Sequence, residues 1–239
     1  MKKLLLAVTI SGSAILSALG DFSATFSSGF QNSGNIPDGS TIGLADTRTL
    51  TGIPFNSIAD VNVRLNISGG WNGDLYAYLV HNSGFSVLLN RVGRDGSSSF
   101  GYGDSGLNLT FDDQASQSAD IHFYQTVAGF NNSMIQGAAA WRPDGRNVSP
   151  LSPGASLASA SRTALLDQFF HQDPNGNWTL FIADVSGGGG QATIQSWGLD
   201  LVPTAVPEPA SIVEASLAVF FLGAVALLYR VRNVKVLAS

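Results

Sequence analysis

Four aspartates fall at the ends of predicted strands, where their carboxylates could hold a hard cation. They are Asp74, Asp112, Asp113 and Asp184. Calcium takes about six to eight oxygen ligands from carboxylates and carbonyls. No continuous loop of alternating acids joins these residues, so two interpretations stay open. Either they form a calcium site, or they cap turns and keep the sheet edges soluble.

A second group of residues has the types needed for a nucleophilic serine. Gly103-Asp104-Ser105-Gly106 matches the tetrapeptide around the nucleophile of chymotrypsin-like proteases. Such a serine also needs a histidine base, an orienting carboxylate and an oxyanion hole. Leu107 replaces the glycine that follows in those enzymes, and His81 upstream falls in a predicted hairpin. We therefore interpret the tetrapeptide as a glycine-rich loop and predict no enzymatic activity.

Alternating apolar and polar residues predict the strands that would hold these side chains. Over residues 61–67 the apolar side chains share one face, and the Asn and Arg side chains share the other. Residues 74–81 and 85–90 predict a hairpin, because turn residues separate two β-prone runs. Further strands are expected at 107–111, 121–124, 178–184 and 194–202. A short helix is expected only at 164–170, before the C-terminal region.

The composition favours an all-β fold with polar turns. Charged residues make up 12% of the chain, against a usual value of about 25%, and 27 of the 239 residues are glycine. Several short strands and few helices predict an antiparallel sandwich. The chain has no cysteine, so neither a disulfide nor a thiol site is available. Its net charge of −5 argues against nucleic acid as a partner.

Two segments resemble the P domain, or Homo B domain, which follows the catalytic domain of subtilisin-like proprotein convertases. The first is 71–84, with Gly73-Asp74-Leu75 at its centre, followed later by Thr110-Phe111-Asp112-Asp113. The second runs from Asn175-Gly176-Asn177-Trp178 through Asp184 to a closing Trp197-Gly198-Leu199. The resemblance covers about residues 35–202. It departs from the family pattern at Trp71-Asn72 and is weak over 125–163.

The resemblance implies an antiparallel jelly-roll β-sandwich of about eight strands over residues 35–203, after a lead-in segment at 21–34. It also implies structural roles for Gly73, Leu75, Trp178 and Trp197. Bacterial members of the family often carry calcium, which adds weight to calcium as a cofactor. We expect the two tryptophans on adjacent strands, where they fill the core between the sheets. A platform on which a ligand stacks is the alternative.

Both ends of the chain indicate export. Lys2 and Lys3 precede an apolar stretch over 4–19, and Ala18-Leu19-Gly20 suits signal peptidase. We therefore predict a signal peptide at 1–20, with a retained membrane helix as the alternative. A linker at 204–211 leads to an apolar run at 212–229, which as a helix would reach about 27 Å and span a bilayer. Basic residues then predict a cytoplasmic tail at 230–239: Arg230, Arg232 and Lys235.

The linker carries a motif that changes the meaning of this transmembrane helix. Val206-Pro207-Glu208-Pro209, the apolar span and the basic terminus together resemble the PEP-CTERM sorting signal of Gram-negative, biofilm-forming bacteria. The resemblance implies an inner-membrane precursor that an exosortase recognises and cleaves near the motif. A plain C-terminal anchor is the alternative.

These observations predict a non-catalytic P-domain protein at the cell surface or in the exopolysaccharide matrix. Its expected role there is adhesive, carbohydrate-associating or structural, and its partners would be exopolysaccharide together with the export enzymes. The alternative is an accessory P domain that stabilises or targets a separate, secreted subtilisin-like protease. Because fold alone does not determine function, the site has to decide between them.

Overall fold

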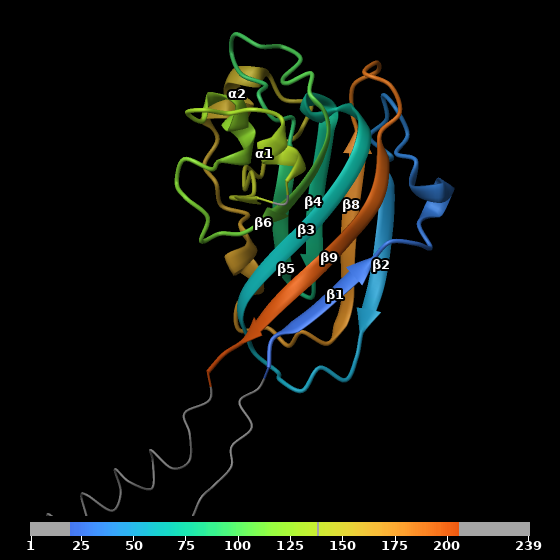
Figure 1. Cartoon of the computed structure of the whole chain (residues 1–239), viewed down its shortest axis with the longest axis vertical. Helices are drawn as coiled ribbons and strands as arrows, with labels where there is room; N and C mark the ends of the chain where they lie inside the picture. The colour runs from blue at the N-terminus through green and yellow to red at the C-terminus, as the bar shows by residue number, and fades with distance from the viewer. Residues whose placement is uncertain (1–19, 138, 206–239) are drawn as a thin grey trace, which may run out of the picture. The chain divides into compact units, whose positions relative to one another are not determined.

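The computed structural model describes residues 20–137 and 139–205, which form two packed β-sheets (Figure 1). One sheet has five strands in the order β1-β9-β3-β6-β7, and the other has four in the order β2-β8-β4-β5. Neighbouring strands are antiparallel, apart from the parallel pair β6 and β7. The strands are β1 Phe22–Phe26, β2 Leu44–Leu50, β3 Ile58–Trp71, β4 Leu75–His81, β5 Gly84–Asn90, β6 Ser105–Phe111, β7 Ala140–Trp141, β8 Gly176–Asp184 and β9 Thr193–Pro203.

Helical structure in the described residues is limited to short turns between strands. The elements are η1 Gln31–Gly34, η2 Asn72–Asp74, η3 Ile121–Thr126, α1 Ser133–Gln136, α2 Gly154–Ser159 and η4 Leu166–Phe169. None of these helices, within residues 20–137 and 139–205, has the length and apolar character needed to cross a bilayer. The prediction of an all-β sandwich is confirmed.

Most of the strands predicted from alternation are present, and the differences have local causes. The strands expected at 61–67, 74–81, 85–90, 107–111, 178–184 and 194–202 correspond to β3, β4, β5, β6, β8 and β9. The strand expected at 121–124 is wrong. Those residues form η3, because the Asp120 carboxylate accepts a hydrogen bond from the His122 amide at 3.0 Å and turns the chain. The helix expected at 164–170 is only the 3-10 turn η4.

The lead-in segment expected at 21–34 contains a strand of the sandwich. β1 pairs with β9 along its whole length, from Phe22 opposite Leu201 to Phe26 opposite Trp197. The sandwich therefore begins before residue 35. Because β1 starts where β9 ends, both ends of the described chain leave from the same end of the sandwich (Figure 1). We call this the terminal end and the opposite end the distal end.

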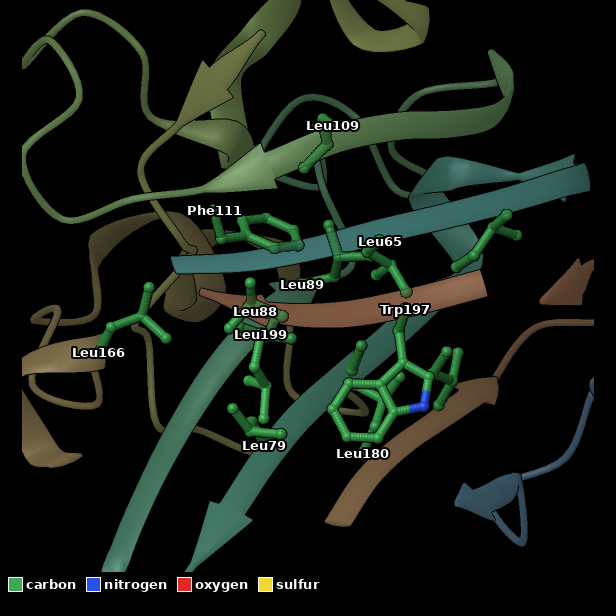
Figure 2. Packing of buried hydrophobic residues seen from close by; sticks show 14 of the residues in the cluster. Leu65, Leu79, Leu88, Leu89, Leu109, Phe111, Leu166, Leu180, Trp197 and Leu199 are labelled. Atoms are coloured by element: carbon green, nitrogen blue, oxygen red, sulfur yellow. The ribbon is translucent and has the colours of Figure 1, made fainter. Parts of the chain in front are cut away.

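The core lies between the sheets, where inward side chains from both sheets meet (Figure 2). Trp178 and Trp197 are not on adjacent strands, since β8 and β9 belong to different sheets. Both indoles are nevertheless buried, and each Nε1 donates a hydrogen bond: Trp178 to the Pro174 carbonyl at 2.9 Å and Trp197 to Asp46 Oδ2 at 2.6 Å. The core role is confirmed, and buried rings cannot serve as a stacking platform.

Candidate functional site

Four aromatic side chains lie together on the outer side of the four-stranded sheet. They are Tyr76, Tyr78, Phe85 and Phe181, which we call the aromatic face; all four are partly exposed. Tyr78 and Phe181 are stacked, with ring centroids 4.8 Å apart and an interplanar angle of 18°. Tyr78 also lies 5.2 Å from Phe85 and 5.7 Å from Tyr76. Outward positions of a sandwich are normally polar, so a contiguous aromatic group there indicates a binding surface.

Strand register and one glycine build this face. Tyr78 on β4 is directly opposite Phe181 on β8, so the two rings meet as a cross-strand pair. Gly43, just before β2, has a φ of 59° and lies beneath the Phe181 ring. A Cβ atom at Gly43 would clash with the Ile182 carbonyl oxygen and lie 2.6 Å from Cζ of Phe181, so this position requires glycine for the ring to keep its place.

A groove of about 400 Å³ opens at the distal part of the aromatic face. Its lining residues are Thr41, Tyr76, Tyr78, Ser149, Pro150, Leu151, Phe181, Ala183 and Val185. None of these lining residues is an acid or a base. Burial raises the pKa of Tyr76 to about 12, so its hydroxyl stays protonated and neutral at ordinary pH. Leu151, which is 61% exposed, offers a further apolar contact at the rim.

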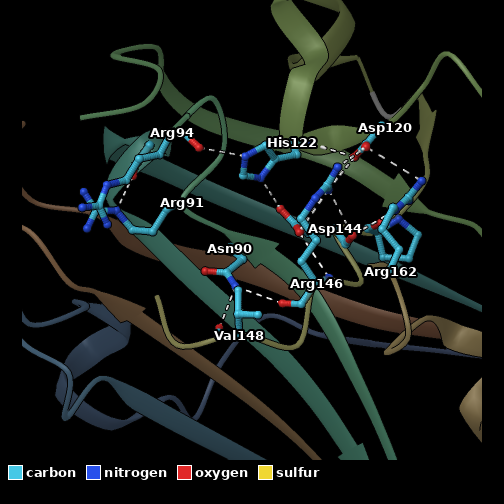
Figure 3. A network of polar contacts seen from close by, with 11 residues as sticks. Asn90, Arg91, Arg94, Asp120, His122, Asp144, Arg146, Val148 and Arg162 are labelled. Carbon is cyan, nitrogen blue, oxygen red and sulfur yellow. Dashed lines mark hydrogen bonds and ion pairs between the residues drawn. The ribbon is translucent and has the colours of Figure 1, made fainter. Parts of the chain in front are cut away.

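Hydrogen bonds hold the loop that leads to Leu151, and Figure 3 shows those from Asn90 to Arg146 and Val148. Arg94 Nη1 donates to the Pro150 carbonyl at 3.1 Å. Asn90 Nδ2 donates to the carbonyls of Arg146 and Val148, each at 3.0 Å. These bonds position one wall of the groove without placing a charged side chain inside it.

The same loop is anchored in a buried ionic network around Asp144. His122 Nδ1 lies 2.7 Å from Asp144 Oδ2, and Nε2 lies 3.1 Å from the Arg94 carbonyl. Both ring nitrogens lie within hydrogen-bond distance of oxygen atoms, so the buried ring is held on two sides. Arg146 donates to Asp120 Oδ2 at 2.8 Å and contacts Asp144. Burial alone would raise the pKa of Asp120, but the hydrogen bond and charge of Arg146 lower it overall. The network is a structural support.

Rows of hydroxyl and amide groups continue from the aromatic face toward the terminal end. The hydroxyls of Thr47 and Thr179 are 2.8 Å apart across β2 and β8. One step further along these strands, Thr49 Oγ1 donates to Asn177 Oδ1 at 2.7 Å. We call these four residues the polar rows. Aromatic rings beside neutral hydrogen-bonding groups match a ligand with apolar faces and hydroxyl edges.

Sequence reasoning missed the aromatic face, although β4 carried a signal. Tyr76 and Tyr78 alternate with Leu75 and Ala77, so both faces of the strand are apolar. A strand of this kind is either buried on both sides or has an apolar outer surface. The partner ring, Phe181, is about 100 residues away in the chain, and the pairing of β4 with β8 brings it close.

Two of the four predicted calcium ligands lie together at the distal end. Asp74 and Asp184 are both buried, and Oδ2 of each has no hydrogen-bond partner. Arg91 supplies a cation: its Nη2 lies 3.2 Å from Asp74 Oδ1. Burial, together with the charges of Asp74 and Asp38, raises the pKa of Asp184 to about 6. Burial likewise raises the pKa of Asp74, while Arg91 opposes the shift.

The other two predicted ligands, Asp112 and Asp113, lie elsewhere, so the four aspartates do not form one site. They follow the last residue of β6, whereas Asp74 lies near its first residue, roughly 20 Å away along the strand. Asp112 Oδ1 accepts from the Gln114 amide at 2.6 Å, and Asp113 Oδ2 accepts from the Asp167 amide at 2.8 Å. Both act as turn caps. In the described part of the chain, no three His, Cys, Asp or Glu side chains are grouped to hold a metal ion.

The structural motif residues have clear packing roles. A Cβ atom on Gly73 would lie 2.5 Å from the Tyr102 amide nitrogen, so this turn requires glycine. Leu75 is fully buried in the core.

The tetrapeptide around Ser105 has no base beside it. Ser105 begins β6 opposite Trp71, and Asp104 Oδ2 accepts from the Tyr124 hydroxyl at 2.8 Å. No hydrogen bond joins Ser105 to a histidine within the described ranges. His81 instead stacks on Trp178 at 3.9 Å, and His122 contacts Asp144.

The predicted export elements lie outside the described residues, apart from their boundaries. These are the signal peptide up to residue 19, the motif Val206-Pro207-Glu208-Pro209, the span at 212–229, and Arg230, Arg232 and Lys235 of the tail. They stay predictions.

Comparison with known proteins gives limited matches. No family model matches this sequence, and no curated protein does. Among solved structures, a chain in the complex of the Aeromonas sobria serine protease with the chaperone ORF2 is similar, with 15% identity and a TM-score of 0.41. The serine protease of Aeromonas sobria is similar with 14% identity and a TM-score of 0.43. The matches cover 80% and 81% of this chain, but only 27% and 28% of those chains.

Proposed function

We propose that this chain is an exported, non-catalytic module that binds carbohydrate at the cell surface or in the exopolysaccharide matrix. The observation that supports it is the stacked Tyr78–Phe181 pair on the outer side of the sheet. Aromatic rings pack well against the apolar faces of sugar rings, and the threonine and asparagine side chains of the polar rows can bond the hydroxyl edges. A groove beside the pair extends the contact area.

The fold and the expected export route fit this role. With the two-residue strand β7 set aside, the strand orders are those of a jelly roll, as the resemblance to P domains implies. The linker at 204–211 begins at the terminal end, whereas the groove opens toward the distal end. During sorting the chain would be held at the inner membrane by the predicted transmembrane segment. After exosortase cleavage it would meet the matrix polysaccharide.

Substitution of Phe181 by alanine tests the proposal. We expect the mature protein, recovered from cells that express the full chain, to be retained on the exopolysaccharide of its own cells. We expect Phe181→Ala to weaken retention at least tenfold, since half of the stacked pair is removed; tenfold corresponds to about 1.4 kcal/mol. Affinity electrophoresis or calorimetry measures the change, and melting curves confirm folding.

Phe100→Ala is the matched control. Phe100 is also an exposed phenylalanine, at 71%, but it lies outside the aromatic face. Its loss should leave retention within about twofold, since it removes no contact of the proposed site. If the unmodified protein is not retained above an unrelated β-sandwich, the carbohydrate function is wrong.

A further inference from the structure

We infer that the ligand of the aromatic face is a neutral glycan whose chain follows β8 from the groove at Leu151, across the Tyr78–Phe181 pair, to the polar rows. This inference rests on the proposed function and adds the ligand class and its direction. Three observations carry it: the charge of the face, the engagement of the nearby arginines, and the order of side chains along the strands.

The outer side of the four-stranded sheet has no acid or base among its described strand residues. Alternation places these side chains outward: Ala45, Thr47, Thr49, Tyr76, Tyr78, Val80, Phe85, Asn177, Thr179, Phe181 and Ala183. Recognition of carboxylate or sulfate groups on an acidic glycan relies on arginine or lysine. This face offers neither, whereas neutral hydroxyls pair well with threonine and asparagine.

Arginines on the elements around this face are engaged by other partners. Arg94 lies behind the loop, where Nε donates to the Ser99 carbonyl at 2.9 Å and Nη1 donates to the Pro150 carbonyl. Arg48 on β2 bonds to Asp46 at 2.7 Å and to the Ser28 carbonyl at 2.6 Å. At the distal end Arg91 is also engaged, because its Nη2 lies 3.2 Å from Asp74 Oδ1.

The order of side chains along β8 sets the direction of the glycan. Phe181 stacks with Tyr78, Thr179 then pairs with Thr47, and Asn177 pairs with Thr49. From Phe181 to Asn177 the strand rises roughly 13 Å, which is long enough for more than one sugar ring. Stacking contacts therefore lie at one end of the path and hydrogen-bonding contacts at the other.

Binding to two soluble glycans of equal length tests the inference, with a neutral glucan and a polyuronate measured by calorimetry at low and high salt. We expect the glucan to bind at least tenfold more tightly than the polyuronate, with no salt dependence, because no ion pair forms. Thr179→Lys places a cation on the path and should raise polyuronate affinity several-fold at low salt. Thr110→Lys, on the outer side of the other sheet, is the matched control and should leave both affinities unchanged.

The possible results separate the two proposals. Preferential, salt-sensitive polyuronate binding, or equal binding of both glycans, would overturn the neutral-glycan inference while the carbohydrate function stands. If neither soluble glycan binds but the protein is retained on the native exopolysaccharide, the neutral-glycan inference is overturned and the carbohydrate function stands. Absence of binding to every polysaccharide overturns both proposals. A dimer in sedimentation that Phe181→Ala dissociates would assign the face to self-association and overturn both.

Discussion

The two outer faces of this sandwich obey the same strand alternation but use their side chains differently. On the five-stranded sheet, Arg64 of β3 extends across β9 and donates to the Ala24 carbonyl of β1 at 2.9 Å. It also lies 3.4 Å from Asp200. On the four-stranded sheet, the outward rings of Tyr78 and Phe181 contact each other and solvent. The outer face of the five-stranded sheet therefore holds the edge strand β1, whereas the outer face of the four-stranded sheet exposes aromatic rings to solvent.

A glycine explains how the Arg64 side chain can cross β9 and reach β1. Gly198 lies directly opposite Arg64, and a Cβ atom there would be 2.5 Å from the Ala24 carbonyl oxygen and 2.9 Å from Arg64 Nη2. The missing side chain gives the guanidinium its route to β1. Edge strands of sheets need protection of this kind. The contrast teaches that the outward charged residue Arg64 on the five-stranded sheet serves stability, while the outward aromatic residues of the four-stranded sheet have no equivalent structural task.

Gly198→Ala should have the largest effect on stability. It tests whether Arg64 holds the edge strand β1 against the sheet. The new methyl group would push against the Ala24 carbonyl and displace Arg64, which overpacks the site and loosens β1. We expect the free energy of unfolding to fall by about 3 kcal/mol, as measured by urea denaturation. Glycan affinity should not change, because the aromatic face is on the other sheet.

Gly103→Ala is the matched control, since a Cβ atom at Gly103 would meet nothing within 4 Å. Equal stability of the two variants would show that Arg64 does not fasten β1. A loss of glycan binding in the Gly198 variant would instead show that the two faces are coupled.

The strands were predictable because their signals are local, whereas the site was not. Alternation and turn residues mark β4 and β8 within a few residues. The meeting of Tyr78 with Phe181 depends on a pairing between strands that are distant in sequence, and one sequence gives no information on that pairing. The same limit applies to the aspartates. Asp112 follows β6 and Asp184 is the last residue of β8, but the sequence does not tell which end of the sandwich each strand end reaches.

β1 was missed for a different reason. Five residues between the expected leader and a glycine-rich turn form too short a pattern to distinguish from a linker. Its strand character comes from β9, which is more than 170 residues away and supplies every backbone partner.

Asp184→Asn should have an intermediate effect on stability. It tests whether the acids at the distal end influence ligand binding at the aromatic face. The pKa of Asp184 is raised from 3.8 to about 6 in the folded chain by burial and by the charges of Asp74 and Asp38. Between these values the folded state binds more protons than the unfolded state, so stability falls as pH rises through this window and is lowest above it. Arg91, which faces the same carboxylates, limits the loss.

The Asp184→Asn variant removes this proton uptake. Between about pH 4 and 6, the unfolding free energy of the unmodified protein should therefore fall by on the order of 2 kcal/mol more than that of the variant. Urea titrations across that range measure the difference. Glycan affinity should stay constant with pH in both proteins, because no outward side chain of the aromatic face titrates there. A pH-dependent affinity that the variant abolishes would show that the acids act on the groove. Identical stability profiles would refute the proton uptake by Asp184.

Thr47→Ala should have the smallest effect, and it tests whether the polar rows belong to the binding surface. The Thr47 hydroxyl lies 2.8 Å from that of Thr179 and is exposed, so its removal should change the free energy of unfolding by less than about 0.5 kcal/mol. If a glycan reaches this row, its affinity should fall about threefold, because one neutral hydrogen bond is lost. Thr110→Ala on the other outer face is the control and should change neither quantity. Calorimetry with the neutral glucan measures the difference. An unchanged affinity would confine the ligand to the rings of Tyr76, Tyr78 and Phe181, and the contrast between the two outer faces would then rest on the aromatic residues alone.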